Sequence, residues 1–175
     1  MGYMNIAHTF SDVLIQPAYS DIESRTEVDL STKVGDVELK LPILTANMKT
    51  VTGPDMVRAA HQAGALGVLH RFTDTLEQDI AKCMDVQAIP LDQLNGKNHG
   101  AYTTDPDFLV DRHVAVSLGV QESDKDLFFR YWNLGCRVFC IDVAHGHHKL
   151  VKNMIKWITK EGERQDITVI AGNVA

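Results

Sequence analysis

The chain has 175 residues, 45% of them hydrophobic, and a formal net charge of −6 at pH 7. This length and composition fit one globular domain with its own core, and an acidic balance without a Lys/Arg cluster argues against nucleic acid as a partner. No apolar run reaches the roughly 20 residues that a membrane span needs, and the first residues lack the pattern of a secretion signal. The sequence therefore predicts a cytoplasmic protein that acts on small molecules.

Three cysteines, Cys83, Cys136 and Cys140, occur without a CxxC pair. Cys136 and Cys140 belong to one predicted strand, where a separation of four residues corresponds to about 13 Å, too far for a disulfide. Reduced thiols are therefore predicted. None of the three follows the end of a strand, so we interpret them as packing residues and not as nucleophiles.

From residue 41 onward, short β-branched runs alternate with amphipathic helical stretches. The predicted strands are 41–47, 65–70, 114–120, 137–146 with its loop, and 166–173; the predicted helices are 53–64, 74–86, 122–135 and 147–162. This alternation predicts an α/β fold with a parallel sheet covered by helices. Five strands and four helices correspond to the first part of a TIM (β/α)₈ barrel, which needs eight of each. A doubly wound sheet is the alternative, but no GxGxxG turn follows the first strand.

Two segments lie outside this repeat. Residues 1–40 precede it, and the alternating stretch around "VGDV" (34–37) predicts a hairpin that caps the amino-terminal mouth of the barrel. Residues 88–112 contain Pro, Gly, Asn and Asp without any period and predict a long exposed loop. The chain 1–175 is thus predicted to be the amino-terminal portion of a single barrel domain.

Polar side chains follow four of the predicted strands. They are Asn47 with Lys49, His70 with Arg71, Asp142 with His145, and Asn173. Because the carboxyl ends of parallel strands meet at one face, we expect these groups to converge on a ligand site.

Asp142 and Arg71 each have two interpretations. Asp142 is either a ligand acceptor, for a ribose or a carboxamide, or a structural group that caps the helix near His147 or pairs with a neighbouring loop. Arg71 is either a fixed cation for phosphate or a surface residue paired with Asp74 or Glu77.

Two further polar motifs stay open. "SRTE" (24–27) is either a polar loop or a phosphate contact through Ser24 and Arg25. The three histidines of "HGHH" (145–148) lie too close in sequence to bind one ion together, because zinc ligands usually come from several segments. No metal site is predicted, and Gly146 is interpreted as part of a tight turn.

Five ordered blocks, "TFSDVLIQPAYSDIESRTEVDLST", "LPILTANMKTVTG", "GALGVLHRF", "CIDVAHGHH" and "VIAGNVA", resemble the GMP reductase / IMP dehydrogenase family. The resemblance covers nearly all of the chain except 88–112. It implies a barrel that assembles as a homotetramer. GMP reductase uses NADPH to convert GMP to IMP and ammonia, and IMP dehydrogenase uses NAD to oxidise IMP to XMP. Both reactions pass through a cysteine thioimidate, and the nicotinamide carries the hydride.

The reductase is the closer resemblance. The dehydrogenase typically carries a regulatory domain between its second helix and third strand, and residues 88–112, at that place in this chain, are too few for a domain. The stretches "ANMKT" and "HRF" also resemble a reductase branch. Lys49 differs from the Asp that much of the family has at this position. Two alternatives stay open: a dehydrogenase-like enzyme without the regulatory domain, and a short non-catalytic protein that binds a nucleotide or pairs with another barrel.

The resemblance also implies roles for individual residues. Cofactor contacts are implied for Ser24 and Arg25, which would reach a neighbouring subunit, and for Arg71, Asp142, Val143 and Ala144; substrate contacts are implied for Asn47, Met48 and Asn173. The family's catalytic cysteine, its neighbouring Thr, the potassium loop and the glycine-rich phosphate loops lie downstream of "AGNV". The expectation is therefore that these 175 residues are inactive without the remainder of the barrel, as a second chain or a further segment.

Overall fold

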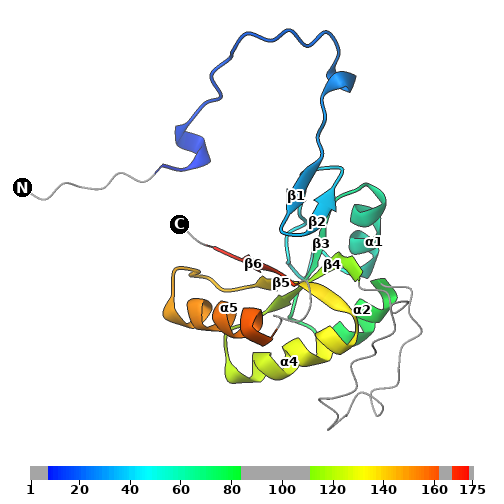
Figure 1. The fold of residues 1–175 in the computed structure, drawn as a ribbon, viewed down its shortest axis with the longest axis vertical. Helices are drawn as coiled ribbons and strands as arrows, with labels where there is room; N and C mark the ends of the chain where they lie inside the picture. Colours follow the sequence, from blue (N-terminus) through cyan, green and yellow to red (C-terminus); the bar gives the residue numbers. More distant parts are fainter. Residues whose placement is uncertain (1–7, 84–110, 162–166, 174–175) are drawn as a thin grey trace, which may run out of the picture.

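The computed structural model describes residues 8–83, 111–161 and 167–173, and its body is built on a four-stranded parallel sheet (Figure 1). The strands are β3 (Gly67–Leu69), β4 (Asp111–Leu118), β5 (Cys136–Ile141) and β6 (Thr168–Ala171), paired in that order. Neighbours in the sheet are also neighbours in the chain, whereas a doubly wound sheet reverses its strand order. This topology is that of one side of a (β/α) barrel.

Four helices of the described residues alternate with these strands, as the sequence predicts. They are α1 (Pro54–Gln62), α2 (Leu76–Cys83), α4 (Glu122–Asn133) and α5 (Lys149–Glu161). α1 precedes β3, and α2, α4 and α5 come after β3, β4 and β5. α5 starts at Lys149 and not at 147 because His148 acts as its cap: the His148 carbonyl accepts from Lys152 N–H at 3.2 Å, and Nδ1 accepts from Leu150 N–H at 3.1 Å. No helix of the described ranges is long and apolar enough to cross a membrane.

The two faces of the sheet have different neighbours. Side chains at alternating positions of β4, among them Val114, Val116 and Leu118, pack with the helices in the larger core, where Phe128 of α4 is fully buried. On the opposite face lies a smaller apolar cluster made of Val37, Leu39, Leu66, Val68, Ala115 and Val138, to which no helix contributes. This second face is the inner face of the part-barrel, because barrel helices lie outside the strands.

A hairpin covers the amino-terminal end of this inner face. β1 (Thr32–Val34) and β2 (Val37–Leu39) pair antiparallel through the "VGDV" turn, where Gly35 has φ +59. The Asp36 N–H donates to Thr168 Oγ1 at 3.2 Å, and Thr168 is the first residue of β6. The opposite, carboxyl ends of the strands carry the candidate site residues.

Two predicted boundaries differ from the structure. Residues 41–47 run beside β3 but form one bridge, between Leu44 and Leu66, instead of a complete strand. Pro42 has no N–H to donate, and the preceding Leu41 N–H donates to Gly64 O. Few residues of this segment are therefore left to form ladder hydrogen bonds with β3. β4 begins at Asp111, inside the range 88–112 predicted as loop; the rest of that range and the end of the helix predicted over 74–86 lie largely outside the described residues.

Residues 8–31 leave the body as an extended arm (Figure 1), called the arm below. Two short 3-10 turns interrupt it, at Phe10–Asp12 and Arg25–Glu27. The side chains of Leu14, Ile15 and Tyr19 are 98%, 97% and 93% exposed. These three apolar side chains therefore contact little of the described body.

Candidate functional site

Backbone hydrogen bonds hold the carboxyl ends of three strands at one edge. The Asp142 N–H, just after β5, donates to Leu118 O at the end of β4 (2.8 Å), and the Gly172 N–H donates to Ile141 O (3.0 Å). One step further out, the Gly146 N–H donates to Asn173 O at 2.9 Å, which links the loops that follow β5 and β6. The polar groups at these strand ends therefore share one edge.

Arg71 and Asp142 form an ion pair across this edge. Arg71 Nε lies 3.6 Å from Asp142 Oδ2, and the side chains are 33% and 25% exposed. The interpretation that pairs Arg71 with Asp74 or Glu77 is wrong, since Glu77 pairs with Arg130 at 3.3 Å. The interpretation of Asp142 as a partner for a neighbouring loop is confirmed, and the helix cap belongs to His148 instead.

The Arg71 guanidinium keeps hydrogen-bonding capacity. Its Nε is buried and has no hydrogen-bond partner among the described residues, because 3.6 Å to Asp142 is too long for a hydrogen bond. Its Cζ lies 4.7 Å from the centroid of the exposed Phe72 ring, a cation–π contact that holds the side chain in place. Buried donors without a partner are uncommon, and such a position can be completed by a water, an ion or a ligand oxygen.

A hydrogen bond to β4, the strand beyond β3, holds the Asn47 side chain. Its Nδ2 donates to Ser117 Oγ at 3.0 Å, and Ser117 is fully buried in β4. Ser117 is not among the predicted site residues, although a hydroxyl inside the apolar run "VAVSLGV" signals a polar partner. Met48, next to Asn47, is 56% exposed.

The remaining candidates lie in different surroundings. Asn173 adopts a left-handed conformation with φ 49, which Asn tolerates better than most residues. Val143 packs against the larger core, and Ala144 is exposed. Ser24 and Arg25 lie exposed on the arm, and within the described ranges no hydrogen bond or ion pair joins them to the other candidates.

The cysteines lack the features of a nucleophile. Burial, and secondly the Asp142 carboxylate, raise the pKa of Cys140 to about 11, so this thiol stays protonated at neutral pH. Cys136 is buried at the start of β5, and Cys83 is half-buried on α2. These environments agree with packing roles.

The "HGHH" loop does not gather metal ligands. The rings of His145 and His147 are 6.5 Å apart between centroids, and His148 caps α5. Over the part of the chain that the structure describes, no three His, Cys, Asp or Glu side chains come close enough to hold an ion.

Comparisons with known proteins match this chain over nearly its whole length. A family model described as the IMP dehydrogenase / GMP reductase domain matches residues 7–175. A GMP reductase of Acidovorax sp. (strain JS42) is 32% identical over 167 residues, 94% of this chain and 43% of the relative. An inosine-5′-monophosphate dehydrogenase of Nitrosopumilus maritimus is 46% identical over 71 residues, 40% of this chain and 15% of the relative.

A solved structure has the same fold. The crystal structure of inosine 5′-monophosphate dehydrogenase from Legionella pneumophila superposes with a TM-score of 0.70 at 31% identity, over 95% of this chain and 44% of that one. The chain therefore spans less than half the length of these relatives.

Proposed function

The chain belongs to the IMP dehydrogenase / GMP reductase family, and we propose that it forms the amino-terminal part of a GMP reductase-like oxidoreductase. The proposed reaction is the NADPH-dependent reductive deamination of GMP to IMP and ammonia. The observation that carries it is the Arg71–Asp142 pair with its unused donor, held at the carboxyl ends of the strands beside Asn47. GMP reductase relatives match 94% of the chain at 32% identity, and the Legionella IMP dehydrogenase structure matches 95% at 31%. The preference for the reductase therefore rests on the short segment at 88–112 and on the "ANMKT" and "HRF" blocks.

The cofactor side of the proposal rests on residues that follow two strands, β3 and β5. Asp142 offers a carboxylate that can accept from a carboxamide, and the buried Nε of Arg71 lacks a described partner, so both fit a nicotinamide nucleotide. Val143 and Ala144 follow Asp142 directly and would lie beside the ring. When bound, the nicotinamide supplies the hydride, and the protein supplies its orientation.

The substrate side uses the neighbouring strand ends. Asn47, oriented by its hydrogen bond to Ser117, would present its amide to the nucleotide, with Met48 beside it. Asn173 would contribute from the loop after β6. Because Ser117 is fully buried, the Asn47 amide is fixed in advance, which lowers the cost of ordering it on binding.

A thioimidate requires a cysteine that is reactive near neutral pH. Cys140, with a pKa raised to about 11, does not meet this requirement, and Cys83 and Cys136 are in packed surroundings. We therefore assign the nucleophile, the potassium-binding loop and the remaining strands of an eight-stranded barrel to polypeptide beyond these 175 residues. The active form proposed is a cytoplasmic homotetramer, in which Ser24 and Arg25 of the arm contact a cofactor on a neighbouring subunit.

An IMP dehydrogenase-like activity is the second candidate, favoured by the 46% identity over 71 residues to the Nitrosopumilus enzyme. Paired assays on the intact gene product distinguish the two. GMP-dependent oxidation of NADPH supports the reductase, and IMP-dependent reduction of NAD without any reaction of GMP would replace it by the dehydrogenase. Binding of GMP with turnover in neither assay would favour a non-catalytic nucleotide-binding protein.

A further inference from the structure

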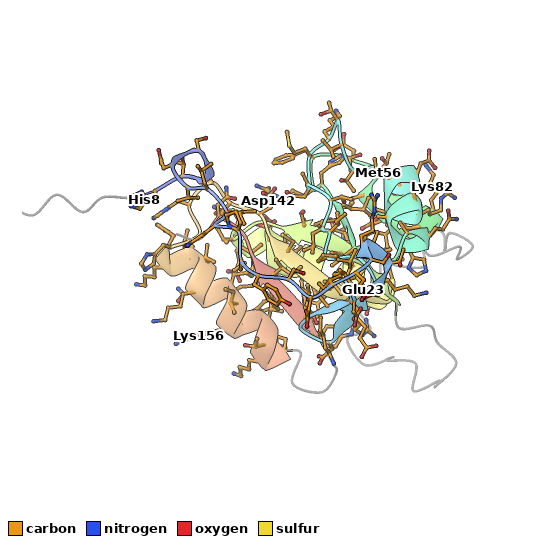
Figure 2. The ribbon with its side chains drawn as sticks, turned by 90° about the horizontal axis from the view of Figure 1, so that it is seen from above. His8, Glu23, Met56, Lys82, Asp142 and Lys156 are labelled. Carbon is orange, nitrogen blue, oxygen red and sulfur yellow. The ribbon has the colours of Figure 1, made fainter. Side chains whose placement is uncertain are left out.

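A row of backbone hydrogen bonds, called the row below, joins the carboxyl ends of three strands. The Gly172 N–H, just after β6, donates to Ile141 O at 3.0 Å. The N–H of the next residue, Asp142 (labelled in Figure 2), donates to Leu118 O at 2.8 Å. The peptide group between Ile141 and Asp142 is therefore bonded on both sides. The row runs from β6 through β5 to the end of β4, and it holds the backbone of Asp142 in place.

The row ends on a buried carboxylate. The Leu118 carbonyl belongs to the same peptide group as the Gly119 N–H, and this N–H donates to Asp124 Oδ1 at 3.0 Å. Asp124 lies in the first turn of α4 and is only 6% exposed. Aligned peptide groups strengthen one another in a chain of hydrogen bonds, and a charged acceptor makes the last bond stronger. Asp124 therefore anchors the row that carries Asp142.

Capping of α4 explains only part of this geometry. The second carboxylate oxygen of Asp124, Oδ2, accepts from the Gln121 N–H at 2.8 Å, which is the usual bond of a capping box at a helix start. The bond from Gly119 lies outside this box, two residues further back. A Cβ on residue 119 would lie 2.5 Å from Asp124 Oδ2, so the carboxylate takes this place only beside glycine. The φ of Gly119 is not positive, so the close approach and not the backbone conformation requires glycine here.

We propose that Asp124 is a positioning residue for Asp142 in cofactor binding. It acts through the peptide group of Leu118 and Gly119, which fixes the Asp142 backbone. This backbone in turn places the Asp142 carboxylate 3.6 Å from Arg71 Nε. All the elements that carry the contact, β4, α4 and β5, belong to the described chain. The inference rests on the proposed function, because that function assigns Asp142 to the nicotinamide nucleotide.

NADPH titration and hydrogen exchange of the intact gene product test this role. Asp124→Asn keeps the side-chain volume but leaves one acceptor oxygen for two N–H donors, and Gly119→Ala displaces the carboxylate. Each substitution should raise the dissociation constant for NADPH at least about tenfold. Each should also speed hydrogen exchange of the Asp142 and Gly172 amides at least about tenfold, while the Leu66 amide, which lies outside the row, keeps its rate.

Asp126→Gly is the matched control for the stability of α4. Asp126 is exposed on this helix, and glycine weakens the helix without touching the row. Loss of folded protein lowers the fraction of molecules that bind but not their affinity, so the control should keep the NADPH dissociation constant within about threefold. The double variant Gly119→Ala/Asp124→Asn should bind NADPH within about threefold of the weaker single variant, since both changes break the same contact.

Three results would overturn the proposal. They are unaltered exchange of the Asp142 amide in both variants, a dissociation constant raised equally by Asp126→Gly, and a double variant whose loss of affinity is the product of the two single losses. If the unmodified protein binds no NADPH, the proposed function fails, and amide exchange then decides by itself whether Asp124 positions Asp142.

Discussion

Replacing both members of the Arg71–Asp142 pair tests whether it serves binding or stability. At 3.6 Å, and with an effective dielectric constant of about 20, the gross Coulomb attraction is about 4–5 kcal/mol. The side chains are 33% and 25% exposed, and desolvation and side-chain ordering offset most of that attraction, so the net contribution should be about 1 kcal/mol. The pair is therefore expected to add little to the stability of the fold.

A double-mutant cycle with Arg71→Ala and Asp142→Asn measures this coupling from urea unfolding of the 175-residue chain. We expect a coupling free energy of about 1 kcal/mol. In the intact gene product, Asp142→Asn should lower kcat/KM for GMP at least about 100-fold, since the amide keeps the shape of the carboxylate but not its charge. A coupling above about 3 kcal/mol together with unchanged kcat/KM would show that the pair is structural and refute the reasoning.

Three other substitutions follow from the backbone and from buried groups. Gly67→Ala should destabilise the fold by about 1–3 kcal/mol in urea unfolding, because the new Cβ would lie 2.7 Å from the Cα of Val57. Gly53→Ser is the control: space around Gly53 is open, so the free energy of unfolding should change by less than about 0.5 kcal/mol. The pKa of Cys140 is raised from 9.0 to about 11, so the folded state keeps the thiol proton to a higher pH than the unfolded state does. The free energy of unfolding should therefore fall as pH rises from 9.0 to about 11, and it should fall less in Cys140→Ala. An identical fall in both proteins would contradict this. Asn173→Gly should change the unfolding free energy by less than about 0.5 kcal/mol, since Gly accepts φ 49 without strain. The same substitution should weaken GMP binding measured by calorimetry. Unaltered binding would show that Asn173 is not part of the site.

Much of the fold follows from local patterns in the sequence. All four helices appear, because each has an apolar stripe and recognisable ends, such as Pro54 in the first turn of α1 and Gly64 with φ +80 after it. Residues 41–47 have the apolar composition of a strand but form only the Leu44–Leu66 bridge. The length of a strand depends on how many of its residues bond to a neighbouring strand in the folded protein. The apolar composition of a segment does not carry this information.

The candidate site was predictable as a set of strand ends but not as a set of contacts. Parallel strands bring Asn47, Arg71 and Asp142 to one edge whatever the details. The partner of Arg71 was not predictable, because Asp74 and Glu77 are closer to it in sequence. Arg71 follows β3 and Asp142 follows β5, so their contact spans the end of β4 and depends on the tertiary structure. Ser117 was not predicted as a site residue because it lies within β4, whereas the predicted site residues follow the ends of strands.

We propose that this chain belongs to an enzyme that moves a hydride from NADPH to the purine of GMP. The most direct measurement supplies the intact gene product with GMP and NADPH deuterated at the transferring position of the nicotinamide, and analyses the nucleotide product by mass spectrometry. We predict IMP that carries the deuterium, with release of ammonia. Unreacted GMP under conditions in which the same preparation converts IMP and NAD to XMP would contradict the assignment.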